Sequence, residues 1–178
     1  KEIFSRMRRT VQDMESLIET LLLLAREDEL QIPDSGQIMN EAIGESIERL
    51  RPLAEKNNNT IHFIDSAKLK VQAPERVVQI LVTNLVRNSI NYTKDGTVSV
   101  SVNETSVRVI DTGIGMTPED LKSAFEPFFR AETGRDMSSG HGLGLSIVKR
   151  LARQFQWTIS AESTPEQGTT VIVSFNES

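Results

Sequence analysis

Three asparagines occupy positions that one face of a helix would carry together. Asn84, Asn88 and Asn91 are spaced i, i+4 and i+7 beside an apolar stripe. Asparagine inside a helix costs about 0.5 kcal/mol relative to alanine, so the row needs either a solvated face or a function. An amide oxygen is a hard, neutral ligand that suits Mg²⁺ and leaves its other coordination positions to phosphates and water. A solvated helix face and a magnesium–phosphate site both account for these residues.

A carboxylate followed by two glycines comes directly after a predicted strand. In Asp111-Thr-Gly-Ile-Gly-Met116, the Asp111 carboxylate could accept a hydrogen bond from an amino group, and the glycines would let a ligand approach the backbone. Adenine offers an exocyclic amine where guanine presents an acceptor, so a fixed aspartate would select adenine. Asp-Thr-Gly is also the signature of aspartic proteases, in which two such carboxylates share a proton. Both interpretations stay open on these residues alone.

Two further segments contain groups that bind anions. Gly140-His-Gly-Leu-Gly-Leu145 opens a predicted helix, where free backbone N–H groups and the helix dipole favour phosphate; a flexible hinge is the alternative, and no P-loop lysine follows. In Phe125-Glu-Pro-Phe-Phe-Arg130, we expect the phenylalanines to pack in the core, while Arg130 and the later Arg135 could reach a phosphate. Gly168-Thr169-Thr170 by itself indicates only a turn.

Alternating and helical patterns predict the elements that would position these residues. Apolar residues at i, i+3 and i+4, and alternation over shorter runs, indicate helices and strands respectively. We expect helices at 38–56, 75–92, from Thr117, and 143–155, and strands at 60–65, 69–72, 97–102, 106–110, 157–161 and 170–175, with a long loop at 125–142.

The N-terminal thirty residues differ from the rest. Their apolar side chains hold a heptad register from Phe4 to Ala25, which predicts a long helix with an apolar seam. Nothing later in the chain repeats the pattern, so we expect packing between chains, with a helix lying back on its own domain as the alternative. We expect this helical segment at 1–31, a linker at 32–37 and a second domain at 38–178.

Composition excludes several classes of protein. The 178 residues are 38% apolar and 25% charged, as in soluble globular proteins, and 20 basic against 25 acidic residues give a net charge of −5. This acidic balance argues against a broad nucleic-acid-binding face. The absence of cysteine excludes disulfide scaffolds and thiol nucleophiles. The longest apolar run, residues 21–25, is too short to span a membrane. The start at Lys1 without a signal-peptide pattern suggests a piece of a longer protein.

In their order and spacing, these segments resemble the ATP-binding domain of sensor histidine kinases. This family shares its ATPase fold with heat-shock chaperones, mismatch-repair proteins and type II topoisomerases. Residues 84–93 look like the asparagine box, 111–115 the first glycine box, 125–130 the phenylalanine box and 140–145 the second glycine box. Residues 14–26 look like the second helix of the dimerisation and histidine phosphotransfer domain.

The resemblance implies a fold and a reaction. The fold would be α+β, a two-layer sandwich in which about three helices cover one face of a mixed sheet of about five strands, preceded by a long coiled-coil-like helix. The enzyme would be an ATP-dependent protein-histidine kinase that uses Mg²⁺ and ATP and passes the phosphate to an aspartate of a response regulator. It would act as a homodimer, without nucleic acid, in the cytoplasmic portion of a bacterial sensor anchored in the inner membrane. A nucleotide sensor without phosphotransfer is the alternative.

The resemblance also implies roles for individual residues. Asn88 would ligate Mg²⁺, Asn84 would support the phosphate end, and Arg130, in a lid over 126–142, would reach the γ-phosphate, so that Asn88 and Arg130 are the expected catalytic residues. The other expected nucleotide-binding residues are those of the adenine pocket, Tyr92, Asp111, Gly113, Gly115 and Thr169, and those of the second glycine box, Gly140, Gly142, Leu143, Gly144 and Leu145.

The chain departs from the family pattern at three places. Asn91 stands where the family usually has a phosphate-binding lysine, and Ser139 and His141 replace the usual glycine and threonine of the second glycine box. The helix with the phosphoacceptor histidine and its neighbouring acid is not found. His62, in a predicted strand without an acid beside it, is not expected to be the acceptor.

Overall fold

The structure, a computed structural model, describes residues 32–134 and 142–175 and seven helical positions of the N-terminal segment, Met7, Val11, Met14, Glu15, Ile18, Leu21 and Leu22. The apolar side chains among these seven are exposed, from 44% at Leu21 to 60% at Met7. The expected linker at 32–37 contains no helix, and its last residue begins strand β1 (Gln37–Ile38). The three-part division of the chain stays a prediction.

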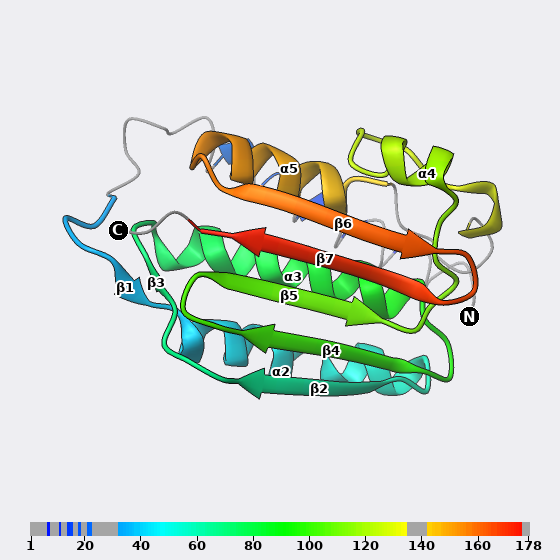
Figure 1. Cartoon of the computed structure of the whole chain (residues 1–178), viewed down its shortest axis with the longest axis horizontal. Coiled ribbons are helices and arrows are strands. Elements are labelled where there is room, and N and C mark those ends of the chain that lie inside the picture. The colour runs from blue at the N-terminus through cyan, green and yellow to red at the C-terminus, as the bar shows by residue number, and fades with distance from the viewer. Residues whose placement is uncertain are drawn as a thin grey trace.

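A five-stranded mixed sheet forms one layer of the domain, in the order β2-β4-β5-β7-β6 (Figure 1). Its strands are β2 (Thr60–Asp65), β4 (Thr97–Val102), β5 (Ser106–Asp111), β6 (Thr158–Thr164) and β7 (Gly168–Ser174). Only the β2–β4 pair within this sheet is parallel, because a helix crosses over between these two strands. β1 and β3 (Lys70–Val71) form a separate antiparallel pair.

Three helices form the second layer. α2 (Asn40–Lys56), α3 (Glu75–Asn91) and α5 (Gly144–Gln154) cover one face of the sheet, with α3 between the other two (Figure 1). The expected fold class is confirmed. Each of these helices begins and ends within two residues of its predicted bounds. Pro74 and Leu143 are the N-caps of α3 and α5, and Tyr92 and Phe155 are their C-caps.

Strict alternation explains why the sheet packs on this side. In β4, the buried residues Val98 and Val100 face the helices, whereas Ser99 and Ser101 point away and remain half-exposed. β5 pairs with β4 and continues to Asp111, one residue beyond the predicted strand. This extra residue puts the carboxylate at the very end of a central strand.

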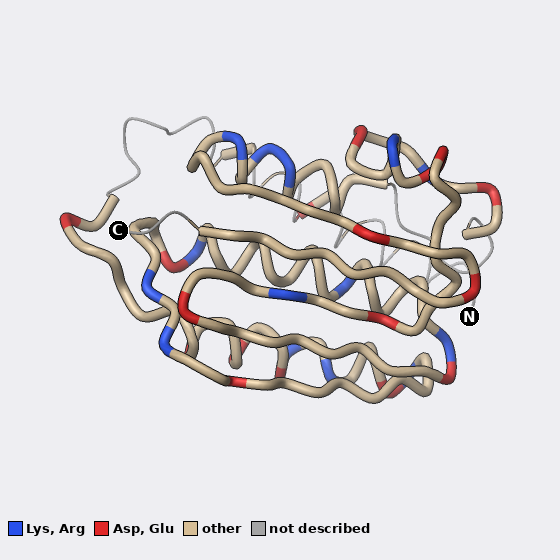
Figure 2. Tube along the Cα trace, viewed as in Figure 1, with Lys and Arg blue, Asp and Glu red and all other residues tan. Residues whose placement is uncertain are grey.

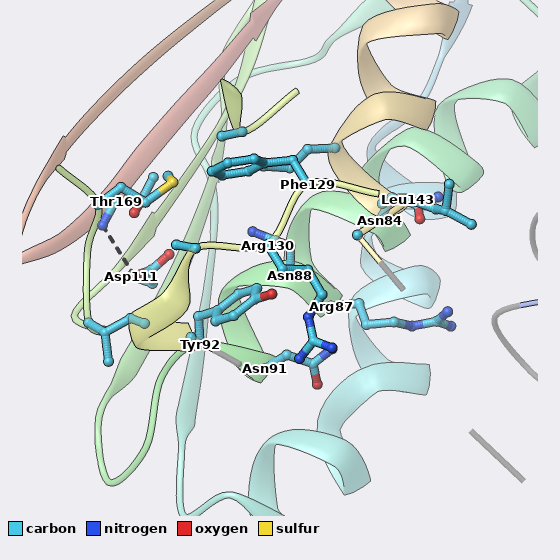
Figure 3. A pocket seen from close by; sticks show the side chains of 18 of the residues that line it. Asn84, Arg87, Asn88, Asn91, Tyr92, Asp111, Phe129, Arg130, Leu143 and Thr169 are labelled. Atoms are coloured by element: carbon cyan, nitrogen blue, oxygen red, sulfur yellow. Dashed lines mark hydrogen bonds between the residues drawn. The ribbon is translucent and has the colours of Figure 1, made fainter. Parts of the chain in front are cut away.

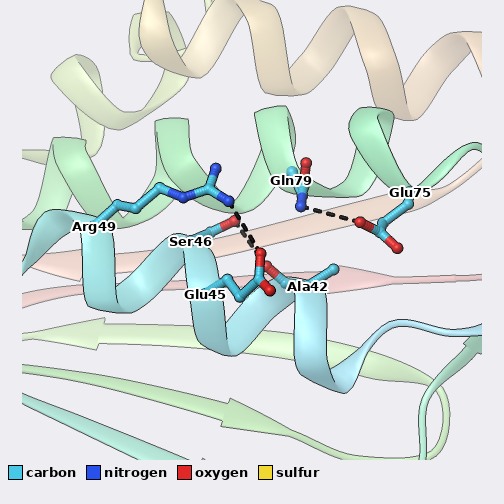
Figure 4. Close-up of polar contacts among 6 residues, drawn as sticks. All are labelled: Ala42, Glu45, Ser46, Arg49, Glu75 and Gln79. Atoms are coloured by element: carbon cyan, nitrogen blue, oxygen red, sulfur yellow. Dashed lines mark hydrogen bonds and ion pairs between the residues drawn. The ribbon is translucent and has the colours of Figure 1, made fainter.

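The α2–α3 contact contains a few polar groups that are satisfied locally (Figure 4). The buried Ser46 hydroxyl donates to the carbonyl of Ala42 at 2.9 Å, and Gln79 donates to the Glu75 carboxylate at 3.2 Å. These bonds lie within one helix each, so they satisfy buried polar groups without tying the two helices together. Apolar packing therefore holds α2 against α3.

The long loop at 125–142 begins after a short helix, α4 (Pro118–Ser123). Thr117 caps α4 as predicted, since its hydroxyl accepts from the N–H of Asp120 at 3.1 Å. The described part of this loop, 125–134 and 142, contains one 3₁₀ turn, η2 (Glu132–Gly134). Phe128 N–H donates to the Gly142 carbonyl at 2.9 Å and so brings the two ends of the loop together.

Two expectations are wrong. The strand predicted at 157–161 runs instead from Thr158 to Thr164, because it pairs with β7 up to Gly168. Phe128, expected in the core, is 71% exposed and adopts a left-handed conformation with φ of 64°. The bond from its N–H to Gly142 turns the chain at this point, so the ring faces solvent while Phe125 packs against the core.

Candidate nucleotide-binding site

One cavity, about 1060 Å³ out to its open mouth, lies between α3, the end of β5, the start of β7, the loop after α4 and the first turn of α5 (Figure 3). Most of the residues predicted for the site line this cavity: Asn84, Asn88, Tyr92, Asp111, Gly115, Arg130, Gly142, Leu143, Gly144, Leu145 and Thr169.

Asp111 is the one acidic side chain among the residues that line the described cavity, and it is held firmly. It is 5% exposed, and its Oδ1 accepts the N–H of Gly113 at 2.9 Å and that of Thr169 at 3.2 Å. Burial raises the pKa of Asp111, against the opposing effect of the hydrogen bonds from Gly113, the Ser89 hydroxyl and Thr169. Each carboxylate oxygen can accept more than one hydrogen bond, so Asp111 can still accept from an amino group in the cavity.

Glycines build the backbone around this carboxylate. Gly115, with φ of 62°, lies so close to the Thr164 carbonyl that a Cβ would collide with it. Gly113 does not line the cavity. It lies behind Asp111, where a Cβ would come within 2.9 Å of Oδ1 and 2.8 Å of the Thr93 hydroxyl. Gly113 was predicted to form part of the adenine pocket. It instead supports the Asp111 carboxylate from behind.

The asparagine row faces the cavity, which favours the functional interpretation over a solvated helix face. Asn84 is 6% exposed and donates to the Ile80 carbonyl at 2.8 Å, with its Oδ1 toward Gly144. The side chain of Asn88 makes no hydrogen bond to any described residue, so its amide oxygen is available. Asn91 lines the cavity one turn further along.

The first turn of α5 closes the same end of the cavity. Gly142, with φ of 72°, leads into Leu143, the N-cap, and Gly144 begins the helix beside Asn84. The first N–H groups of a helix have no partner within it, and the positive end of the helix dipole lies there. These donors suit an anion. Gly140, Arg135, Ser139 and His141 lie outside the described residues.

The loop after α4 contacts Tyr92 at one side of the cavity. The ring of Tyr92 lies so close to Gly134 that a Cβ there would come within 2.7 Å of Cε1. Arg130 and Phe129 line the cavity from the same loop. Tyr92 therefore packs against the loop as well as lining the site.

Several lining residues were not predicted from the sequence. Ile114, Met116, Ala124 and Ile147 supply apolar walls that look in the sequence like ordinary core residues. Arg87 lines the cavity from α3, and its position three residues after Asn84 would have placed it on the same helical face.

Comparison with known proteins agrees with this geometry. The family model of histidine kinase-, DNA gyrase B- and HSP90-like ATPases matches residues 73–178, more than half of the chain. The chain belongs to this ATPase family. Membership of an ATPase family implies that this domain binds ATP.

Relatives within the ATPase family are sensor kinases. The chain is 27% identical over 165 residues to the sensor protein CiaH of Streptococcus pneumoniae, covering 89% of this chain and 37% of that protein. It is 34% identical over 133 residues to the sensor histidine kinase YclK of Bacillus subtilis, covering 71% and 28%. The catalytic domain of histidine kinase ThkA superposes with a TM-score of 0.66 at 26% identity, covering 80% of this chain and 95% of that domain.

The chain thus corresponds to the ATPase catalytic region of sensor histidine kinases and spans about a third of the length of these curated relatives. Within the described residues, no helix combines the length and the apolar character needed to cross a membrane. The aspartic protease interpretation is not supported, because no second carboxylate lines the described cavity beside Asp111.

Proposed function

We propose that this chain binds Mg²⁺-ATP and transfers the γ-phosphoryl group to a histidine of a dimerisation domain, for relay to an aspartate of a response regulator. The observation that carries the proposal is that Asn88, Asp111 and the N-terminus of α5 line one cavity. Such a reaction needs an acceptor for the adenine amine, a hard oxygen ligand for the metal ion and a helix end that binds phosphate.

The purine would lie at the Asp111 end of the cavity. The carboxylate accepts the exocyclic amine, and Thr169 and Gly113 hold the carboxylate from behind through their N–H groups. Tyr92, Ile114 and Met116 line the cavity with aromatic and apolar surface, which removes water from the base. This end supplies binding and selection of adenine.

The triphosphate would lie along the asparagine row toward α5. Backbone N–H groups of Gly144 and Leu145 bind phosphate oxygens at the positive end of the helix. Arg130 adds a guanidinium from the loop, which neutralises charge on the transferred group. Phosphoryl transfer needs little covalent help, so this positioning and neutralisation are the main contributions of the chain.

The residues present fit a magnesium ion that is bound mainly by the nucleotide. Within the described residues there is no group of three or more His, Cys, Asp or Glu that could hold a metal, whereas Asn88 offers one amide oxygen in the cavity. Mg²⁺ typically accepts one or two protein ligands and completes its shell with phosphates and water. When bound, the ion neutralises phosphate charge.

The phosphoacceptor would come from outside the described cavity. His62 is exposed on β2, the edge strand of the sheet, and does not line the site. The acceptor in this proposal is a histidine of the preceding helix of the dimerisation domain. The exposed apolar residues of the N-terminal segment support pairing of two chains there. In this proposal, the paired chains form the cytoplasmic part of a membrane-anchored sensor.

The decisive experiment joins this chain to a phosphoacceptor helix and follows label from γ-³²P-ATP. We expect an acid-labile phosphohistidine that forms with Mg²⁺ and is lost in the Asp111→Asn variant. Measurable ATP binding without any label would contradict the kinase proposal and favour the nucleotide sensor. Absence of ATP binding would contradict the assignment of the cavity itself.

A further inference from the structure

Arg87 is a cation that the motifs of the sequence do not account for. It lies on α3 between Asn84 and Asn88, lines the cavity and is half-buried. Within the described part of the chain, its guanidinium makes no hydrogen bond and no ion pair. The two arginines of α2, by contrast, are paired, Arg49 with Glu45 at 3.0 Å and Arg51 with Glu48 at 2.7 Å. Arg87 is therefore available to a ligand.

The charges around the cavity are unevenly distributed. Its charged lining residues are Asp111, Arg87 and Arg130, and Asp111 lies at the opposite end from Arg87. In Figure 3, Asp111 and Thr169 lie together on one side of the cavity, while the Arg87 side chain runs away from them beyond the asparagine row. No carboxylate of the described cavity can thus neutralise Arg87 without a bound ligand.

Two positive features meet at this end. Gly144, the first residue of α5, lies against Asn84, and Arg87 follows Asn84 by three residues, so both lie on one face of α3. A guanidinium matches phosphate oxygens two at a time, and a helix N-terminus binds the same kind of group. A ligand with its amine on Asp111 and a polyphosphate tail would place the end of the tail here.

We propose that Arg87 binds the terminal phosphate of the nucleotide and makes the site prefer ATP over ADP. The proposal rests on the assignment of the cavity as an ATP site and adds the residue that senses the length of the polyphosphate. Asn91, one turn later on the same face, is neutral, so Arg87 is the cation that α3 contributes to the cavity.

The test is calorimetric titration of the whole chain and its Arg87→Ala variant with ATP, ADP and adenosine in the presence of Mg²⁺. We expect Arg87→Ala to weaken ATP binding about tenfold, the loss of one charged contact at an open site. ADP binding should change less than twofold, and adenosine binding should not change.

Two further variants make the result specific. Arg108→Ala removes an arginine from the middle of β5, on the face of the sheet away from the helices (blue in Figure 2), and should leave all three affinities unchanged. Arg87→Ala combined with Asn91→Lys returns a cation to the same face and should restore at least half of the lost ATP preference.

Failure of the cavity assignment and failure of the Arg87 proposal give different results in these titrations. If the unsubstituted chain binds no ATP, the assignment of the cavity falls. If it binds ATP, but Arg87→Ala leaves ATP binding unchanged, or weakens ATP and ADP equally, the proposal for Arg87 is overturned. Loss of adenosine binding in the same variant would show a damaged fold and would equally overturn a specific role for the terminal phosphate.

Discussion

The two ends of the cavity are built in different ways. The purine end consists of Asp111 with Gly113, Gly115, Gly168 and Thr169, and it is held by backbone N–H groups and close backbone contacts. The phosphate end consists of Asn84, Arg87, Asn88 and the first turn of α5, where side chains on two helices face an open mouth. The backbone of the purine end is therefore part of the fold, whereas the phosphate end can change without disturbing the sheet.

The largest expected effect separates function from stability at the purine end. In Asp111→Asn, Oδ1 still accepts the N–H groups of Gly113 and Thr169, but an amide N–H₂ then opposes the adenine amine. We expect ATP binding to weaken about 1000-fold, ~4 kcal/mol, while the folded state persists. Calorimetry and a thermal melt measure the two quantities. Unchanged affinity would show that Asp111 does not bind the base.

Glycine substitutions test whether the purine end is part of the fold. Gly115→Ala forces a Cβ into the Thr164 carbonyl at a positive φ, and we expect a loss of about 3 kcal/mol in the free energy of unfolding. Gly44→Ala in α2 is the matched control, because its Cβ would meet only the Phe63 ring at 3.4 Å. It should stabilise the protein by about 0.5–1 kcal/mol. Equal effects of the two substitutions in urea unfolding would show that the fold does not require glycine at position 115.

Asn88→Ala tests the phosphate end alone. Loss of one oxygen ligand should weaken Mg²⁺-ATP binding about 30-fold, ~2 kcal/mol, with adenosine affinity and unfolding free energy nearly unchanged. Asn91→Ala, in the same row and cavity, is the control and should have the smaller effect. A fall in adenosine affinity for Asn88→Ala would mean that the two ends are not independent.

The smallest effect is a pH dependence of stability that belongs to the purine end. Burial raises the pKa of Asp111, so the folded protein binds this proton more tightly than the unfolded chain. The charge of Asp111 therefore destabilises the fold above the raised pKa, and this destabilisation is lost as the pH falls through it. Asp111→Asn should be more stable than the unsubstituted protein at pH 7, by a difference that shrinks toward acid pH. A difference that grows on acidification in urea unfolding would contradict the raised pKa.

The regular elements were largely predictable because their signals are local. Alternation predicts β4, whose bounds agree with the structure, and Thr117-Pro118 predicts the start of α4. The end of β6 was not predictable, because Ser163 and Thr164 carry no apolar alternation and are held only by pairing with β7. The exposure of Phe128 likewise follows from the bond that joins the ends of the loop.

The candidate site likewise has features that the sequence predicts and features that only the structure shows. The amino-acid sequence by itself determined the chemical groups of the site, an amide row, a carboxylate and glycines at a helix start, because residue type and spacing are local properties of the chain. Only the tertiary structure decided that these groups share one cavity, that Gly113 stands behind it and that Arg87 enters it. Burial and the distance between segments far apart in the chain depend on how the helices pack on the sheet, and no local pattern encodes that packing.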